Sequence, residues 1–496
     1  MIHRRRWHPH DRRLGLLAAV VLLAAPLLVA CGSFRPAPGG PSALPDARPA
    51  TGGVPAGTPI RIGAVFPIAG NAAVLALPEL VGVQIAADLV NADGGIEGRT
   101  IAIEVRSLES RAQAPEVMEG LKRDGIEIVI GAYSSDLSIA ASSAADAAGL
   151  LYWEAGAVAD QLTGRGLPLV FRVGASGANL GANSAAFVAA ELAPRLGKSA
   201  AALRVAIAAA ADDYATSVAD AAAATASAAG VQVVLRRSYS LTLPDWPAVM
   251  VDLAAARPDA IILASHIPDG IAFRQAMLAA GLRVGALIGS TMAECDPDFA
   301  GELGPDAVGI FASDRPTAGF KPTALSPDAQ AAYARFSAAW AASPEYAGAG
   351  HIATGSPATG ATAEQDSEYG ASSGDSSYGA SEYTISGPDS PTAEANEEAL
   401  AGFSAAWALF HQVLPDAAEA GTLDTASVAA AARALDLPQG ALPNGAGLHF
   451  SSDPGTLGQN ERAAAVIWQW QAVRHYEFVW PASYATGEIA FVPLER

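Results

Sequence analysis

Short apolar segments alternate with helical patterns along most of the chain, and this alternation limits the possible folds more than any other feature. Strands that alternate with helices form βαβ units and parallel sheets. The rhythm runs through one series and restarts near residue 200, so 496 residues accommodate two such units. We therefore predict an α/β fold of two Rossmann-like lobes with parallel sheets, joined by a hinge that the chain crosses several times. The strands are expected at 60–66, 100–106, 126–130, 150–153, 203–207, 231–238, 260–263 and 286–289.

The restart also sets the expected domain boundaries. In open α/β sheets the ligand binds beyond the carboxyl ends of the strands, so two facing lobes place a site in the cleft between them. The first lobe should comprise 59–172 with part of the chain after 312. The second lobe should comprise 173–311 with part of the C-terminal region. The C-terminal elements in 396–496 should complete both lobes. Crossings are expected near 171–173, near 311–313 and once more after 396.

The amino terminus predicts an extracytoplasmic location. Five arginines precede an uncharged apolar run over 14–30, which is short for a bilayer span of roughly twenty residues but typical of a signal peptide. The run ends in Leu-Val-Ala-Cys-Gly at 28–32, which resembles the lipobox of bacterial lipoproteins. We expect 1–30 to be a signal peptide, Cys31 to carry the lipid that binds the membrane, and the Pro/Gly/Ala-rich segment 31–58 to be a flexible tether. An uncleaved membrane anchor is the alternative.

A second region of unusual composition lies at 343–395. It is rich in Ser, Gly, Asp and Glu, and no Lys or Arg occurs between Arg335 and Arg433. Such a segment buries too little apolar surface to offset its ordering entropy, so we predict a disordered or loosely ordered acidic insertion. Its ends should lie close together on the second lobe, between helices over 329–340 and 397–414.

Composition and motifs argue against several functions. A net charge of −20, from 30 Lys+Arg and 50 Asp+Glu, argues against nucleic-acid binding, which needs clustered basic residues. Two cysteines, Cys31 and Cys295, exclude a disulfide scaffold and Cys-rich metal centres. With Cys31 lipidated, Cys295 is expected to be a small buried apolar residue. No nucleophile elbow, zincin or Walker motif occurs, and no Gly-x-Gly-x-x-Gly follows a strand, so we predict neither an enzyme nor a bound metal or cofactor.

Several stretches together resemble periplasmic-binding-type solute receptors, in particular the branched-chain amino acid (leucine-binding) group of ABC-importer binding proteins. The resemblance depends on their order and spacing from residue 60 to about 481, interrupted by the insertion. The matching stretches are 60–63, 67–70, 82–86, 91–96, 128–135, 155–157, 162–163, 171–172, 458–460, 469–470 and 479–481.

The resemblance implies a set of ligand-binding residues. In these receptors hydroxyl and backbone N–H groups at strand ends hold the carboxylate of an amino acid, a carboxylate holds its ammonium, and aromatic rings close over the rest. Transferred by position, the implied residues are Ser134, Ser135, Ala157, Val158, Tyr214, His266 or Ile267, Thr291 or Met292, and Leu75.

Some positions depart from the family pattern. Val158 replaces a hydroxyl residue and Leu75 an aromatic one, and no carboxylate is in register at Thr291. A buried ammonium without an acceptor costs several kcal/mol, so the ligand class could differ and include an amide or an aromatic acid. From the residues themselves, Trp153 either forms a pocket wall, which we favour, or packs between the lobes. We predict that Asp213 is a helix cap rather than an ammonium ligand.

The resemblance therefore predicts a lipid-anchored receptor that delivers a small amino-acid-like molecule to an ABC permease. Its partners would be the ligand, the permease subunits and, through Cys31, the membrane, with no nucleic acid. The alternative is a ligand sensor or surface interaction protein of the same fold that acts through another partner. The departures in the pocket and the acidic insertion motivate that alternative.

Overall fold

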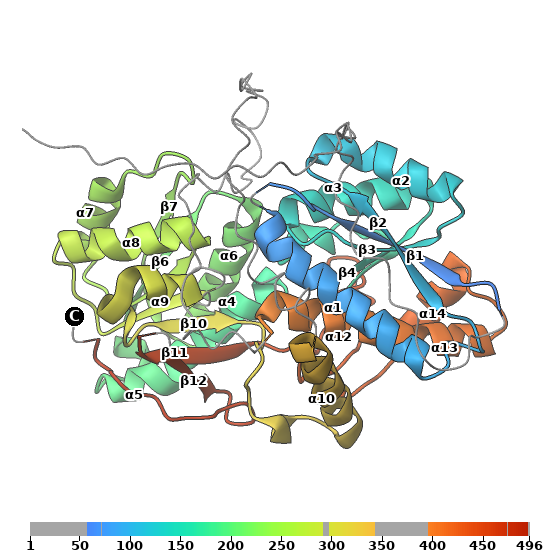
Figure 1. Ribbon diagram of the computed structural model, residues 1–496. Helices are drawn as coiled ribbons and strands as arrows, with labels where there is room; N and C mark the ends of the chain where they lie inside the picture. The colour runs from blue at the N-terminus through green and yellow to red at the C-terminus, as the bar shows by residue number, and fades with distance from the viewer. Residues whose placement is uncertain (1–56, 71, 291–296, 343–394, 474, 495–496) are drawn as a thin grey trace, which may run out of the picture. The chain divides into compact units, whose positions relative to one another are not determined.

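The computed structural model describes residues 57–70, 72–290, 297–342, 395–473 and 475–494 (Figure 1). The predictions for the signal peptide, Cys31, nearly all of the tether, Thr291, Met292 and Cys295, and the insertion up to residue 394, fall outside these residues.

The first sheet contains five parallel strands in the order β2-β1-β3-β4-β5. Its central strands are short apolar runs with nearly every residue buried, as expected for a parallel sheet covered on both faces. The first strand has the predicted bounds and the next three differ from theirs by one or two residues, whereas β5 was not predicted as a strand. The strands are β1 (Ile60–Phe66), β2 (Ile101–Ser107), β3 (Ile128–Gly131), β4 (Leu151–Glu154) and β5 (Val170–Arg172).

The helices of this sheet follow its strands along the chain. In α3, Ser134 is the N-cap, and its hydroxyl accepts a hydrogen bond from Leu137 N at 3.3 Å. The helix ends at Gly149, whose φ of +69° is the left-handed conformation that glycine adopts without strain. The three helices are α1 (Ala73–Ala92), α2 (Ala114–Arg123) and α3 (Ser135–Ala148).

The second sheet has seven strands in the order β12-β11-β10-β9-β8-β6-β7. Strands β6 to β10 run parallel, whereas β11 is antiparallel to both β10 and β12. The predicted fold class is confirmed, with the correction that the C-terminal hairpin makes this sheet mixed. The strands are β6 (Arg204–Ala210), β7 (Gln232–Tyr239), β8 (Ala260–Ala264), β9 (Ala286–Ser290), β10 (Phe311–Asp314), β11 (Val466–Ala472) and β12 (His475–Trp480).

Two helices of the second sheet approach each other closely through glycine. A Cβ added at Gly181 of α4 would lie 2.1 Å from Val218 O of α6, so only glycine permits this distance between the two backbones. The helices of this part are α4 (Gly177–Phe187), α5 (Ala193–Arg195), α6 (Asp213–Ala228), α7 (Trp246–Ala256), α8 (Ile267–Ala279) and α9 (Pro297–Leu303).

The helices on either side of the insertion pack on α1 of the first sheet, side by side (Figure 1). The rings of Phe336 and Phe403 stack with centroids 4.5 Å apart. The prediction that the insertion emerges from the second lobe was therefore wrong, because α1 packs on β1 and β2. The C-terminal helices are α10 (Pro327–Ala342), α12 (Glu397–Ala408), α13 (Leu414–Glu419) and α14 (Thr425–Ala434).

Helix α1 is long and apolar enough to cross a membrane by length and composition alone, since its segment Leu75–Ala92 has a mean hydropathy of 1.3. Of that segment, 72% is buried within the fold. In the part of the chain described here, α1 is thus a core helix.

Candidate functional site

The predicted serines and the predicted loop after β4 meet at the carboxyl end of the first sheet. Ser135 is the first residue of α3, and its Oγ accepts hydrogen bonds from Val158 N at 3.2 Å and Ala159 N at 3.0 Å. Ser134, Ser135, Ala157 and Val158 therefore belong to one constellation, which is half-buried at the serines and buried at the loop.

Glu154 holds the beginning of the same loop. Its Oε1 accepts from Ala155 N at 3.1 Å and from Gly156 N and Ala157 N at 2.9 Å each. Its Oε2 accepts from the Tyr152 hydroxyl at 3.1 Å. Burial raises the pKa of Glu154, and the backbone hydrogen bonds oppose this rise.

The carbonyl groups of the loop have partners as well. Arg172, fully buried in β5, donates from Nη1 to Ala157 O at 3.2 Å and to Ala159 O at 2.7 Å. Burial lowers the pKa of Arg172 to about 10, so it remains a cation at neutral pH. Gly177 N at the start of α4 donates to Val158 O at 2.8 Å. The loop is thus held by Arg172 of the first sheet and by Gly177 of helix α4.

The second sheet presents Tyr214 and His266 at the carboxyl ends of β6 and β8. Their ring centroids lie 4.8 Å apart, and His266 Nε2 lies 2.5 Å from Asp212 Oδ2. Asp212 also accepts from Ala215 N at 2.7 Å and is the N-cap of α6. The cap is therefore Asp212, and Asp213, for which a capping role was predicted, is the first helical residue.

Asp269 fixes the turn that contains His266. Its Oδ1 accepts from His266 N at 3.0 Å and its Oδ2 from the Tyr239 hydroxyl at 2.5 Å. Burial raises the pKa of Asp269. These bonds hold the His266 backbone in one position above the sheet end.

The two groups of residues are joined by direct hydrogen bonds. Ser217, one turn after Tyr214 on α6, accepts from Asp160 N at 3.0 Å and lies 3.2 Å from Gln161 Oε1. Asp160 follows Val158 by two residues. The loop of the first sheet and the helix that contains Tyr214 therefore touch at the carboxyl ends of their strands.

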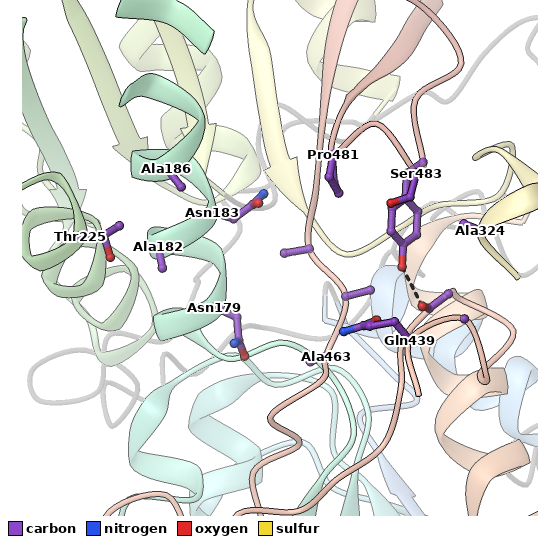
Figure 2. A pocket seen from close by; sticks show the side chains of 15 residues that line it. Asn179, Ala182, Asn183, Ala186, Thr225, Ala324, Gln439, Ala463, Pro481 and Ser483 are labelled. Carbon is purple, nitrogen blue, oxygen red and sulfur yellow. Dashed lines mark hydrogen bonds between the residues drawn. The ribbon is translucent and has the colours of Figure 1, made fainter. Parts of the chain in front are cut away.

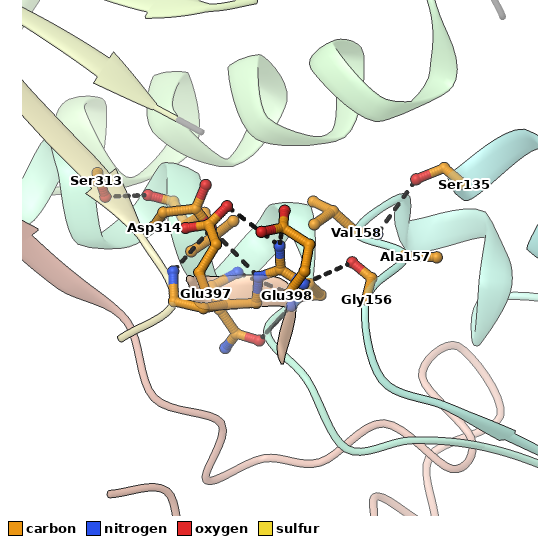
Figure 3. A network of polar contacts seen from close by, with 12 residues as sticks. Ser135, Gly156, Ala157, Val158, Ser313, Asp314, Glu397 and Glu398 are labelled. Atoms are coloured by element: carbon orange, nitrogen blue, oxygen red, sulfur yellow. Dashed lines mark hydrogen bonds and ion pairs between the residues drawn. The ribbon is translucent and has the colours of Figure 1, made fainter. Parts of the chain in front are cut away.

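A buried ionic cluster lies beneath the loop (Figure 3). Arg315, which follows β10, donates from Nη1 to Gly156 O at 3.1 Å, and its Nη2 lies 3.4 Å from Glu397 Oε1 and 3.5 Å from Glu398 Oε1. Asp314 Oδ1 is 3.5 Å from Arg315 Nε. Burial raises the pKa of both glutamates, most strongly for Glu397. Sequence reasoning missed this cluster.

Glu79 of α1 interacts electrostatically with Glu154, Arg315 and Glu398 and so belongs to the same cluster. It is fully buried, and neither carboxylate oxygen has a hydrogen-bond partner among the described residues. Burial, reinforced by the charge of Glu154, raises the pKa of Glu79 well above its usual value. A Cβ at Gly156 would lie 2.0 Å from Glu79 Oε2, so this side chain packs directly on the loop.

Two predicted residues have other surroundings. Trp153 is fully buried with its ring 5.4 Å from that of Phe450, and its indole N–H donates to Ala405 O of α12 at 2.9 Å. These are core contacts, so the structure contradicts the interpretation of Trp153 as a pocket wall. Leu75 is buried in the first turn of α1.

A separate pocket of about 540 Å³ lies between α4, α6 and C-terminal segments (Figure 2). Asn179 and Asn183 of α4 face Gln439 and Ser483 across it, and no charged side chain lines it. Of the predicted ligand residues that the structure describes, none lines this pocket. Within the described ranges no three His, Cys, Asp or Glu residues are arranged to hold a metal ion.

Known proteins share this fold. A family model described as "Periplasmic binding protein" matches residues 59–364. The chain therefore belongs to the periplasmic binding protein family.

The curated relatives are amino-acid-binding protein homologues. The chain is 33% identical over 257 residues to the Leu/Ile/Val-binding protein homolog 8 of Brucella abortus, covering 51% of this chain and 64% of that protein. It is 30% identical over 250 residues to homolog 7 of Brucella melitensis, covering 50% of this chain and 62% of the relative. Each match thus spans less than two thirds of the relative.

Solved structures share the fold at low sequence identity. The substrate-binding protein of a Streptococcus pneumoniae branched-chain amino acid transporter, in complex with isoleucine, superposes with a TM-score of 0.60 at 17% identity, covering 85% of this chain and all of the other. A solute-binding protein from Rhodopseudomonas palustris, in complex with 3,4-dihydroxybenzoic acid, gives 0.58 at 15% identity, covering 83% and 93%.

Proposed function

We propose that this protein is the solute-binding component of an ABC importer and holds a small amino-acid-like ligand or an amide between its two lobes. The observation that carries the proposal is the hydrogen bond from Asp160 N to Ser217 Oγ. It joins the loop beside Ser135 to α6, the helix that contains Tyr214, at the strand ends where open α/β sheets bind ligands. The family membership and the Leu/Ile/Val-binding relatives support it.

The mechanism would be closure of the two lobes around the solute. A ligand that contacts both the Ser135 loop and the Tyr214–His266 pair favours the state in which these groups are close, by its differential affinity for that state. Ser135 would donate its hydroxyl hydrogen, and the two rings would cover the apolar part of the ligand.

Calorimetry and thermal unfolding test the proposal with leucine, isoleucine, leucinamide and 3,4-dihydroxybenzoate as probes. A bound probe raises the melting temperature by mass action. Ser135→Ala and Tyr214→Ala should each weaken binding by about tenfold, corresponding to roughly 1.4 kcal/mol. Ser227→Ala, at an exposed position of the same helix α6, is the control and should bind like the wild type. If no probe binds, or if all three variants bind equally, the proposed site is wrong.

We also propose that the mature protein begins at a lipid-modified Cys31 and acts with permease subunits at the membrane. The motif at 28–32 supports the lipid, and the family supports an extracytoplasmic location. Mass spectrometry of the protein from its membrane fraction should find an acylated amino-terminal Cys31. An unmodified Cys31 in a wild-type chain that retains residues 1–30 would instead favour an uncleaved anchor.

A further inference from the structure

Three successive N–H groups at the start of the ligand loop converge on one carboxylate oxygen. Ala155, Gly156 and Ala157 all donate to Glu154 Oε1, at 3.1, 2.9 and 2.9 Å. Consecutive backbone N–H groups that point at one spot form an anion-binding concavity. In this protein the side chain of Glu154, from the same segment, fills that concavity.

The next two N–H groups of the loop are also engaged. Val158 N and Ala159 N both donate to Ser135 Oγ. A serine hydroxyl has two acceptor sites and one hydrogen, so these bonds use its acceptor capacity and leave the hydrogen to donate. The described residues give that hydrogen no acceptor, and Ser135 is half-buried. A solute at this position therefore meets one hydroxyl donor and no unengaged loop N–H group between 155 and 159.

The ionisable groups beside the loop are predominantly acidic. Five carboxyl groups from four elements gather there with two guanidinium groups, and both cations are already bound to the protein. Arg315 contacts Gly156 O and the two α12 glutamates, and Arg172 contacts the carbonyls of Ala157 and Ala159. The carboxyl groups are those of Glu79, Glu154, Asp314, Glu397 and Glu398.

We propose that Glu154 determines specificity by occupying the backbone anion site of the ligand loop, so that the cleft selects a solute with a neutral hydrogen-bond acceptor at Ser135, such as a carboxamide, over the matching carboxylate. A carboxamide oxygen accepts the single Ser135 hydrogen without bringing a charge beside the acidic groups. A carboxylate at the same place lacks the N–H donors that would stabilise its charge. This inference rests on the proposed solute-binding function.

Matched pairs of probes test the selectivity in the wild-type protein. Leucinamide with leucine, and benzamide with benzoate, differ at the group in question. The amide of each pair should bind about tenfold more tightly or better. Tighter binding of the carboxylates would overturn the inference while leaving the solute-binding function intact, whereas binding of no probe would contradict the proposed function itself.

Chemical rescue tests the occupied anion site directly. Glu154→Ala empties the concavity, so sodium formate should raise the melting temperature of this variant by roughly 2 to 4 °C relative to sodium chloride of equal ionic strength. The wild type and the control Glu119→Ala, at an exposed position of α2, should not respond. An equal response of all three proteins, or none in the variant, would overturn the inference.

Glu154→Gln keeps the test decisive if the alanine variant does not fold. The amide oxygen can still accept the three N–H bonds, so this variant should keep the preference of the wild type for carboxamides and ignore formate. If Glu154→Gln alone reversed the preference, the charge of Glu154 and not its occupation of the site would set specificity, and the inference would be wrong.

Discussion

The contact between α1 and α12 depends on two glycines, Gly82 of α1 and Gly402 of α12. The substitution Gly82→Ala is the sharpest test of this contact. A Cβ at Gly82 would lie 2.1 Å from Ala399 O and 2.6 Å from Phe403 N. The first distance is about 1.3 Å short of the 3.4 Å at which ordinary contact begins. The obstructing atoms belong to the backbone of α12, so no side-chain rotation relieves the overlap and the two helices must separate.

The expected cost follows from two opposing terms. Overpacking a well-packed contact costs about 1 to 3 kcal/mol and at times more, whereas alanine gains about 1 kcal/mol over glycine in a helix. Because backbone meets backbone here, we place the overpacking at or above the upper end of its range, and expect a net loss of roughly 2 to 3 kcal/mol in the free energy of unfolding.

Gly120→Ala is the matched control for this substitution. Gly120 lies in α2, and the nearest atom to its added Cβ is Arg123 Nη2 at 3.8 Å. Only the propensity term acts there, so this variant should be about 0.5 to 1 kcal/mol more stable than the wild type. Urea unfolding followed by circular dichroism should thus shift the two midpoints in opposite directions. A Gly82→Ala midpoint at or above that of the wild type would refute the reasoning.

Three further predictions concern the loop contact, the buried acids and the insertion. Ser217→Ala removes the bond to Asp160 N and should weaken solute binding by about fivefold, for a hydrogen bond of roughly 1 kcal/mol; unchanged affinity in calorimetry would show that this bond does not contribute to closure. The raised pKa of Glu79 means that the folded protein keeps a proton that the unfolded chain loses above about pH 4.5, so this term makes stability fall as pH rises. Glu79→Gln should therefore flatten the decline of the urea midpoint above about pH 4.5, and an unaltered slope would assign the decline to other groups. Replacing 344–394 by a short Gly-Ser linker should leave solute affinity and melting temperature nearly unchanged, because α10 and α12 already pack together on α1; a drop of roughly 8 °C or more would show that the segment packs.

Hydrophobic pattern located eight of the twelve described strands, because buried parallel strands are short apolar runs bounded by turn residues. It did not locate β5 or the strands β10 to β12. Helix starts were less accurate. Apolar periodicity alone places the starts of two helices at 138 and 270, whereas these helices begin at Ser135 and Ile267. Their N-caps are Ser134 and His266, and α8 has a proline in its first turn. Such residues are typical of helix starts but do not contribute to apolar periodicity. The capping residues Ser134 and His266 were the available signal.

The sequence likewise predicted some residues of the candidate site and missed others. Ser135 and Val158 were placed by the order and spacing of family-like stretches, and the structure joins them. The partners of Arg315 could not be found in one sequence, since Glu397 and Glu398 lie beyond the insertion and pairing over such separations leaves no local pattern. Two acids in a first helical turn usually indicate a solvated helix start. Here tertiary packing leaves them only 6% and 3% exposed.

The close contact of α1 and α12 explains how so many acids remain beneath the loop. Burying several carboxyl groups with few countercharges costs free energy. The glycine contact at Gly82 and Gly402 and the aromatic stack of Phe336 on Phe403 bring the backbones together and supply apolar burial in the same region. The positions of Glu79 on α1 and Glu398 on α12 are thereby set by the packing of these two helices, which does not depend on the charge of either glutamate. A displacement of the loop at Gly156 would have to move both the Glu79 contact and the Arg315 hydrogen bond, so any movement of the loop on solute binding is coupled to the strand that precedes Arg315.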